Sequence, residues 1–175
     1  MPSSRVLTVP NLLSFARIPL AAAFVAVHGT GARLALIIVA SATDLLDGWL
    51  ARMGTTTRFG ALLDPIADKT FILVALSSFL FAGTLSIPDY FVIISRDLAT
   101  AVGFLVAYLL PGLDPADFKA RWPGKIVMVL QLAALFVLLL RPALLPWLLL
   151  PIAAASTWAI VDYTLFLVKV RGKRA

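Results

Sequence analysis

Long apolar stretches alternate with short polar breaks along almost the whole chain. The breaks lie at His28–Arg33, Met53–Arg58, Gly83–Pro88, Pro111–Pro123 and Arg141–Pro142. They separate six apolar segments, near residues 10–28, 32–53, 59–83, 87–110, 124–140 and 143–168. Because a helix needs about 20 apolar residues to cross the hydrocarbon of a bilayer, each segment is predicted to span a membrane. The pattern therefore predicts an all-α, polytopic membrane protein with six transmembrane helices.

Composition agrees with this pattern and narrows the classes of partner. The 175 residues are 61% hydrophobic, with a mean hydropathy of +0.99, which is far from the composition of soluble domains. The apolar segments leave no room for a soluble domain, so residues 1–175 are expected to form a single membrane domain. The net charge of +6 then favours anionic lipid headgroups and phosphorylated substrates as partners, and not nucleic acid. The absence of Cys excludes disulfides and thiolate metal sites.

Basic residues predict the orientation, because cytoplasmic loops of membrane proteins are enriched in Lys and Arg. If the N-terminus is cytoplasmic, the opposite side carries only Arg33 and Arg141. The cytoplasmic side then carries Arg5, Arg52, Arg58, Lys119, Arg121, Lys125, Lys169, Arg171, Lys173 and Arg174. Both termini, and the loop between the second and third segments, are thus predicted to be cytoplasmic, as in a bacterial inner-membrane protein.

The candidate chemistry lies beside that loop. All nine acidic residues are Asp, and four of them fall within 25 residues: Asp44, Asp47, Asp64 and Asp68. A charge at the centre of a bilayer costs about 2.5–3.5 kcal/mol on insertion scales, so charges within a membrane are candidates for function. The first two are three residues apart on the second segment, and the last two are four apart on the third. This spacing predicts a cation site between the second and third helices, near the cytoplasmic side; Asp44 would be about 12 Å from Arg52 along the helix axis.

Small residues accompany the carboxylates. On a 3.6-residue helix, two stripes form, one of Asp44, Gly48 and Ala51 and one of Gly60, Asp64 and Asp68. Small residues would let a flat or phosphorylated ligand approach the backbone, and they are equally typical of tight packing between membrane helices. Oxygen ligands point to one or two Mg²⁺ or Mn²⁺ ions, and two ions suit displacement at phosphorus.

The cations near the carboxylates allow two interpretations. Arg52 could hold phosphate oxygens in a bidentate way, or could, like Arg58, be an anchor at the cytoplasmic interface. A single buried Asp could also pair with Lys69 or Arg96 in a structural salt bridge. Four Asp exceed what those two cations could neutralise, which favours a metal site.

These residues resemble the signature of the CDP-alcohol phosphatidyltransferase family. The family pattern is D-x2-D-G-x2-A-R, a short spacer, and G-x3-D-x3-D. All eight fixed positions match, at Asp44, Asp47, Gly48, Ala51, Arg52, Gly60, Asp64 and Asp68. The spacer Met53–Phe59 has seven residues where the family usually has eight or slightly more. The resemblance extends to PNLLSFARIPL near the N-terminus, to Ser95–Asp97 and to the six-helix layout.

The resemblance implies transfer of a phosphatidyl group from CDP-diacylglycerol to an alcohol, with release of CMP, in phospholipid biosynthesis. It implies four metal ligands, Asp44, Asp47, Asp64 and Asp68. It implies contacts of the cytidine diphosphate with Gly48, Ala51, Arg52 and Gly60. Asp68 would also act as the general base that takes the proton of the acceptor hydroxyl. The family further suggests a homodimer.

The acceptor stays open at this point. PNLLSFARIPL and Leu63–Lys69 resemble the glycerol branch, which contains phosphatidylglycerophosphate synthases and CMP-forming cardiolipin synthases. These use glycerol 3-phosphate and phosphatidylglycerol, respectively. Candidate acceptor-binding residues are Arg96, Lys119, Arg121 and Lys125. Lys119 and Arg121 could instead belong to a solvated loop, and Arg96 could simply pair with Asp97. Val127 and Met128 replace a Lys and a Thr that the phosphatidylglycerophosphate synthases often carry, which weakens the case for a small phosphorylated acceptor.

Other functions compete with this prediction. Another acceptor, such as inositol phosphate or serine, would keep the enzyme class. A divalent-cation transporter would use the Asp cluster as an ion site, but the chain shows no internal repeat and has an Arg beside the cluster. An inactive scaffold is disfavoured by the intact signature.

Overall fold

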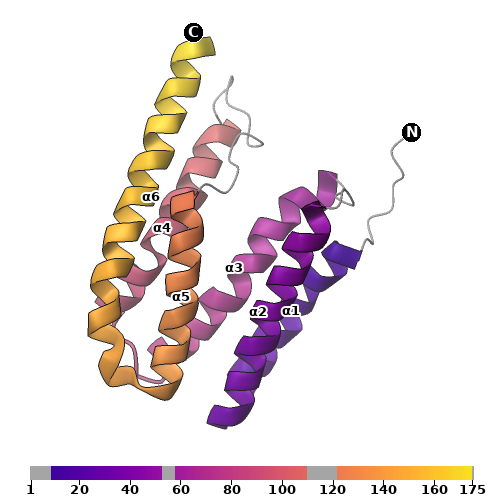
Figure 1. The fold of residues 1–175 in the computed structure, drawn as a ribbon, viewed down its shortest axis with the longest axis vertical. Coiled ribbons are helices and arrows are strands. Elements are labelled where there is room, and N and C mark those ends of the chain that lie inside the picture. Colours follow the sequence, from indigo (N-terminus) through magenta and orange to yellow (C-terminus); the bar gives the residue numbers. More distant parts are fainter. Residues whose placement is uncertain (1–8, 53–57, 110–121, 175) are drawn as a thin grey trace. The chain divides into compact units, whose positions relative to one another are not determined.

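The computed structural model describes the backbone of residues 9–52, 58–109 and 122–174, and the side chains of residues 15–46, 69–103 and 122–166. The regular elements in these ranges are all helices, with no strand among them, which confirms the predicted all-α class. Within the described backbone, six α-helices and one 3₁₀ turn follow in order: α1 (Val9–Ala26), α2 (Thr30–Arg52), α3 (Arg58–Phe81), α4 (Ile87–Leu109), α5 (Trp122–Leu140), η2 (Pro142–Leu144) and α6 (Leu145–Arg174) (Figure 1).

The packing divides the chain into two compact units. The first comprises Met1–Leu85 with Leu138–Leu140, and the second comprises Ser86–Val137 with Arg141–Ala175. The expectation that residues 1–175 form a single membrane domain stays a prediction.

In the first unit, α1 packs against both α2 and α3. Phe24 of α1 is fully buried and meets the rings of Phe71 and Phe79 of α3 edge to face, at centroid distances of 5.8 and 6.0 Å. At the start of α2, the guanidinium of Arg33 lies over the rings of Phe24 and Phe79 and its Nε donates to the carbonyl of Val27 at 2.7 Å. Cation–π contacts of this kind stabilise the corner where α1 turns into α2.

In the second unit, α4 packs against α6. A small apolar cluster joins α5 to α6, where Val127 contacts Ala155 and Ala159, with Leu130 against them. Small residues on α6 allow the two helices to approach closely, as is common for helices in membranes.

The turn between α3 and α4 is determined by local hydrogen bonds. Gly83 adopts a φ of +71°, a conformation that costs glycine no side-chain clash. The amides of Gly83 and Thr84 donate to the carbonyls of Leu80 and Phe79, each at 3.0 Å, which is the Schellman arrangement that ends a helix. Ser86 then caps α4, since its hydroxyl lies 2.7 Å from an oxygen of Asp89 and accepts from the Asp89 amide at 3.3 Å.

Several hydroxyl side chains inside the helices are satisfied by their own backbone, whereas the buried Oγ of Ser156 has no hydrogen-bond partner among the described residues. Ser41 donates to the carbonyl of Ile37, and Thr100 donates to that of Arg96, each at 2.7 Å. The same type of bond is made by Thr43, Ser78, Ser95, Thr157 and Thr164. Because lipid offers no hydrogen-bond partner, this pairing lets polar residues lie in apolar helices.

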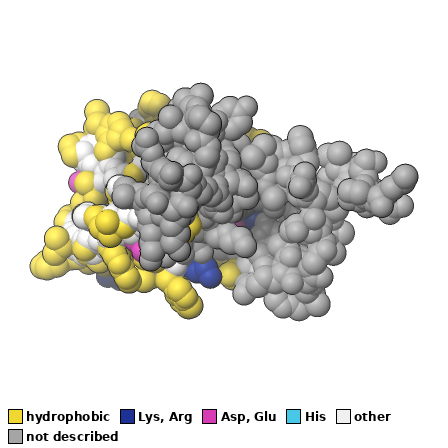
Figure 2. Space-filling view, turned by 90° about the horizontal axis from the view of Figure 1, so that it is seen from above, with side chains coloured by type: hydrophobic (Ala, Val, Ile, Leu, Met, Phe, Trp, Pro, Cys, Tyr) yellow, Lys and Arg dark blue, Asp and Glu magenta, His cyan; other side chains and the backbone are white. Residues whose placement is uncertain are grey.

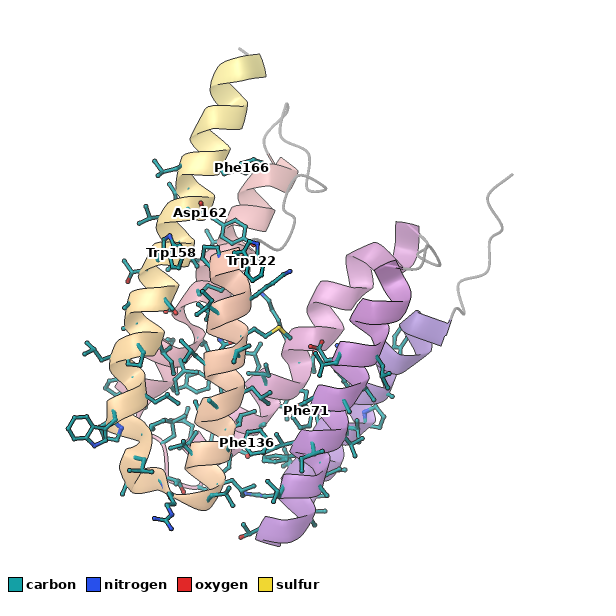
Figure 3. All side chains as sticks on the ribbon, in the orientation of Figure 1. Phe71, Trp122, Phe136, Trp158, Asp162 and Phe166 are labelled. Atoms are coloured by element: carbon teal, nitrogen blue, oxygen red, sulfur yellow. The ribbon has the colours of Figure 1, made fainter. Side chains whose placement is uncertain are left out.

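Two helical stretches of the described chain are long and apolar enough to cross a membrane, Trp122–Leu140 and Pro142–Phe166. Shorter apolar stretches lie in α1 (Phe15–Ala26) and α3 (Lys69–Phe81). Large apolar side chains such as Phe81, Trp147 and Leu150 are exposed. The described side chains on the face shown in Figure 2 are mostly hydrophobic. Figure 3 shows Trp158, Asp162 and Phe166 on successive turns of α6.

Candidate functional site

The signature residues occupy the end of α2 and the beginning of α3. Asp44 to Arg52 form the last turns of α2, which ends at Arg52, and Gly60 to Asp68 lie in the first turns of α3, which begins at Arg58. Among these residues the structure describes the side chain of Asp44. The side chains of Asp47, Gly48, Ala51, Arg52, Gly60, Asp64 and Asp68 lie outside the described part.

Asp44 forms an ion pair with an arginine of α1. Its Oδ1 lies 3.3 Å from Nη2 of Arg17, whose side chain is only 2% exposed, whereas the Asp44 side chain is 25% exposed. Both residues also take part in interactions beyond this pair. The sequence offered Lys69 or Arg96 as the partner of a buried Asp in a structural salt bridge; the described partner of Asp44 is Arg17 of α1.

Apolar contacts place this pair. Arg17, Ala21 and Phe24 are buried at successive turns of α1, while Ile37 and Ala40 are buried on α2 two turns and one turn before Asp44, respectively. The spacing i, i+4, i+7 on α1 and i, i+3, i+7 on α2 gives each helix one continuous stripe. The ion pair is the polar end of the contact between α1 and α2.

The described side chains include no group of three or more His, Cys, Asp or Glu that could hold a metal ion. Three of the four predicted ligands are outside the described side chains, so the metal site stays a prediction. The donor chemistry fits it: Asp44 offers a partly exposed carboxylate on a helix that also carries Asp47, and hard divalent cations prefer carboxylate oxygens.

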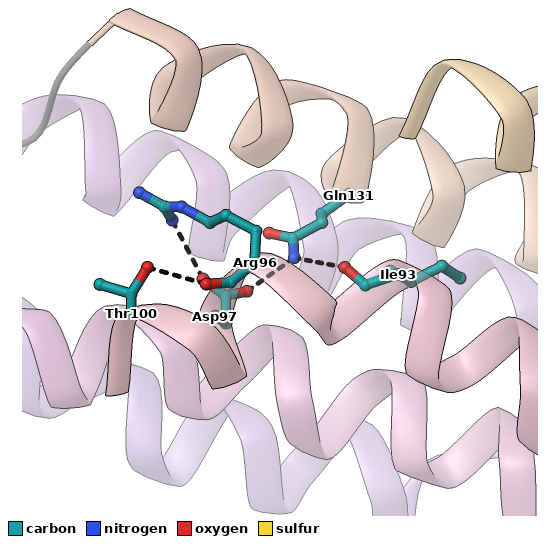
Figure 4. Close-up of polar contacts among 5 residues, drawn as sticks. All are labelled: Ile93, Arg96, Asp97, Thr100 and Gln131. Carbon is teal, nitrogen blue, oxygen red and sulfur yellow. Dashed lines mark hydrogen bonds and ion pairs between the residues drawn. The ribbon is translucent and has the colours of Figure 1, made fainter. Parts of the chain in front are cut away.

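A second polar cluster lies in the second unit (Figure 4). Nη1 of Arg96 lies 3.0 Å from Oδ1 of Asp97, and the amide of Gln131 from α5 donates to Oδ2 of Asp97 at 2.6 Å. The same amide nitrogen donates to the carbonyl of Ile93 at 2.8 Å. The pairing of Arg96 with Asp97, which the sequence left open, is thus confirmed, and Gln131 links α4 to α5.

The guanidinium of Arg96 is held on further sides. Its carbon lies 5.9 Å from the ring centroid of Tyr163 on α6. A Cβ placed on Gly124 would meet Nη2, so a side chain at this position would require the guanidinium of Arg96 to move. Nε is buried and has no hydrogen-bond partner among the described residues. Arg96 is therefore oriented by its surroundings and retains one donor for a ligand.

The other candidate acceptor-binding residues are placed only in part. Lys125 is exposed, and its ammonium lies 5.1 Å from the ring centroid of Trp122. Lys119 and Arg121 lie outside the described residues. Of the four candidates, the structure shows Arg96 buried and Lys125 at the surface.

A comparison with models of known protein families identifies the family of this chain. The CDP-alcohol phosphatidyltransferase profile matches residues 7–161 of the chain. The chain belongs to this family. The match includes the signature residues and Arg17, and it confirms the resemblance that the motif indicates. Members of the family are transferases, which also sets the class of enzyme expected here.

Similar proteins come from both glycerol-using groups. The chain is 34% identical to a CDP-diacylglycerol--glycerol-3-phosphate 3-phosphatidyltransferase of Yersinia pestis over 137 residues, 73% of this chain and 74% of the relative. It is 36% identical to a protein of that name from Aquifex aeolicus over 103 residues, 55% of this chain and 58% of the relative. It is 37% identical to a cardiolipin synthase (CMP-forming) of Rattus norvegicus over 107 residues, 58% of this chain and 35% of the relative. The matched regions thus span about a third to three quarters of these phosphatidyltransferases.

The structure adds two residues to those predicted from the sequence. Arg17 lies within an apolar segment, where a cation is itself a signal of a buried partner. Gln131 also lies within an apolar segment, and its spacing does not indicate its partners. Both belong to the polar clusters of this phosphatidyltransferase-family chain, and each contacts an aspartate from another helix.

Proposed function

We propose that the protein is an integral membrane enzyme that transfers a phosphatidyl group from CDP-diacylglycerol to a glycerol-type acceptor and releases CMP. Membership of the family supports the donor and the transfer, and the intact signature from Asp44 to Asp68 is the observation that carries the proposal. The reaction serves phospholipid biosynthesis. The acceptor is glycerol 3-phosphate or phosphatidylglycerol, since relatives named for both reactions are similar to the chain.

The reaction needs divalent cations in this proposal. Asp44, Asp47, Asp64 and Asp68 would hold two Mg²⁺ or Mn²⁺ ions, because four carboxylates match the charge of two divalent cations. When bound, the cations neutralise the pyrophosphate and stabilise the departing CMP. Gly48, Ala51, Arg52 and Gly60 would bind the cytidine diphosphate.

In this proposal a carboxylate of the chain accepts the proton of the acceptor hydroxyl. The acceptor hydroxyl oxygen forms a bond to the phosphorus of the phosphatidyl group, and the bond from that phosphorus to the CMP oxygen breaks. Asp68 accepts the hydroxyl proton, since a carboxylate at the edge of the cation site is suited to general base catalysis. The products are CMP and the new phosphodiester.

The acceptor would lie near the second polar cluster. Arg96 is the central candidate because it is oriented by Asp97 and because its buried Nε has no hydrogen-bond partner in the described part of the chain. Lys119, Arg121 and Lys125 would add positive charge. The ion pair with Asp97 lowers the net charge offered to an acceptor, which favours a singly charged phosphodiester headgroup over a phosphomonoester.

The proposed setting is a membrane crossed six times, with both termini and the site cytoplasmic. The two long apolar stretches and the exposed apolar side chains support a membrane location. The distribution of Lys and Arg supports the orientation. A homodimer is part of the proposal, by likeness to the family.

The test is CMP release by the purified protein from CDP-diacylglycerol. The reaction is run with Mg²⁺ or Mn²⁺ and with glycerol 3-phosphate, phosphatidylglycerol, inositol 1-phosphate or serine as acceptor. Release that requires a divalent cation and one glycerol-type acceptor is expected. Release only with serine or inositol 1-phosphate would replace the acceptor and keep the enzyme class.

Asp68→Asn is the matched variant. It should lose turnover and keep binding of CDP-diacylglycerol, because the base is lost while most of the binding groups remain. Asp89→Asn, which changes an exposed carboxylate at the start of α4, should keep turnover. No CMP with any acceptor, combined with uptake of Mn²⁺ into proteoliposomes, would support a cation transporter instead.

A further inference from the structure

We propose that Arg17 is a built-in counter-ion of Asp44 that opposes cation binding at this carboxylate and stabilises the contact between α1 and α2 when no cation is bound. The inference rests on the proposed function in one respect, namely that Asp44 is a cation ligand. Arg17 does not touch the reacting groups in this proposal, so it is a positioning residue that acts through Asp44.

The geometry supports a permanent pair. Arg17 is 2% exposed and its Nη2 lies 3.3 Å from Oδ1 of Asp44. Its backbone position follows from the buried residues Ala21 and Phe24 on the same face of α1. Phe24 is itself fixed by two aromatic contacts to α3. The guanidinium is thus held next to the carboxylate by packing that does not depend on a cation.

The electrostatic consequence has a definite sign. An arginine stays protonated at all physiological pH values, so its charge cannot be removed when a cation binds. A fixed positive charge a few ångströms from a divalent ion opposes its binding, and burial weakens the screening by water. Arg17 therefore lowers the affinity of the site for the cation, and its removal should strengthen cation binding. Removal of a residue that coordinates the cation would weaken it.

The same charge stabilises the protein in the absence of the cation. Removing one partner of a buried ion pair leaves the other charge uncompensated, which destabilises the folded state. A cation bound at Asp44 supplies a replacement charge. A ligand that binds the folded state tightly stabilises it more, so a chain without Arg17 should depend on the cation for its stability.

The experiment uses Arg17→Met in the purified full-length chain, because Met keeps much of the volume and removes the charge. Mn²⁺ affinity is measured from the free Mn²⁺ signal in electron paramagnetic resonance. Thermal midpoints are measured with EDTA and with Mn²⁺. The Kd for Mn²⁺ is expected to fall by about tenfold relative to wild type, given the size of charge–charge interactions at partly buried sites. The midpoint is expected to fall in EDTA and to recover with Mn²⁺.

Two variants provide controls. Arg17→Lys keeps the charge and should keep a Kd close to wild type. Arg33→Met removes a cation of the same unit that lies over Phe24 and Phe79. It should lower the midpoint by the same amount with EDTA and with Mn²⁺, because its contacts do not involve the signature.

A third comparison does not require Mn²⁺. In EDTA, Arg17→Met should lower the midpoint less in an Asp44→Asn background than in the wild-type chain, because the ion pair is already lost there. An equal loss in both backgrounds would overturn the role of Arg17 as the counter-ion of Asp44. So would an unchanged or weaker Mn²⁺ affinity in Arg17→Met, or a fold that Mn²⁺ does not restore. Failure of the wild-type chain to bind Mn²⁺ would overturn the metal-dependent function together with this inference, whereas binding by wild type with no change in Arg17→Met would overturn the inference alone.

Discussion

Two arginine–aspartate pairs lie in different units of the chain and are built differently. Arg17 and Asp44 come from two helices, their atoms lie 3.3 Å apart, and the aspartate is 25% exposed. Arg96 and Asp97 are neighbours on α4, lie 3.0 Å apart, and have side chains that are 10% and 9% exposed. Gln131 occupies the second oxygen of Asp97. The first aspartate is thus partly open to a ligand, whereas the second is enclosed by protein groups.

This difference in exposure and pairing indicates which residue of each pair is available to bind a ligand. In the first pair the arginine is enclosed and the aspartate is accessible. In the second pair both carboxylate oxygens of Asp97 are used, and Nε of Arg96 has no hydrogen-bond partner among the described side chains. The same two residue types would therefore serve opposite ligands, a cation at Asp44 and an anion at Arg96.

The largest expected effect is a difference in kcat for CMP release between variants of Asp44 and Asp97. Asp44→Asn should lower kcat for CMP release by at least about 100-fold, because it removes a cation ligand. Asp97→Asn should change kcat much less and should mainly raise the KM of the acceptor, because Asp97 only orients Arg96. Steady-state kinetics with varied acceptor would measure both. Equal losses of kcat in the two variants would show that the pairs do not have different roles.

The next effect concerns stability in the second unit. Gln131→Leu should lower the free energy of unfolding by about 1–3 kcal/mol, since it leaves Oδ2 of Asp97 and the carbonyl of Ile93 without this buried donor. Thr157→Val, which removes an exposed hydroxyl that bonds within its own helix, should change it by about 0.5 kcal/mol or less. Thermal unfolding in detergent would compare them. A Gln131 variant as stable as wild type would contradict the link between α4 and α5.

A smaller effect is expected at Gly124. A Cβ there would meet Nη2 of Arg96, and the flexible guanidinium would move at a cost of about 0.5–1.5 kcal/mol. Gly124→Ala should therefore raise the acceptor KM by about three- to tenfold and leave binding of CDP-diacylglycerol unchanged. Gly31→Ala has open space around the added methyl and is the matched control. An unaltered acceptor KM in Gly124→Ala would argue against Arg96 as the acceptor residue.

The smallest effect is expected at the surface. Lys125 lies over the ring of Trp122 in an exposed position, and such cation–π contacts contribute about 0.5–1 kcal/mol. Lys125→Met should thus lower the thermal midpoint by only a few degrees, less than Gln131→Leu does. A larger shift would mean that Lys125 has partners outside the described residues.

The positions of the helices were largely predictable. The segment expected at 87–110 is a helix at Ile87–Leu109, and the one at 59–83 is a helix at Arg58–Phe81. Hydropathy works here because each break contains Gly, Pro or charged residues. The last helix continues to Arg174, beyond the expected end near residue 168. Hydropathy marks the apolar part of a helix, while Lys and Arg favour continued helix at a polar end.

The partners within the polar clusters were less predictable. The pairing of Arg96 with Asp97 could be expected because the two residues are adjacent in the sequence. The pairing of Arg17 with Asp44 depends on which residues of α1 lie beside which residues of α2. The local sequence of either helix does not determine this register. The same holds for Gln131, whose partners lie on another helix. The signature residues could be recognised from their spacing alone, but their geometry requires side chains beyond those described.

The two pairs also bear on the order in which the chain enters a bilayer. In the proposed six-span arrangement, the adjacent Arg96 and Asp97 would offset each other's charge as soon as α4 forms, so this helix could be inserted by itself. Arg17 and Asp44 meet only when α1 lies against α2. The first two helices would therefore be inserted together as a hairpin, with the α1–α2 corner formed before release into lipid.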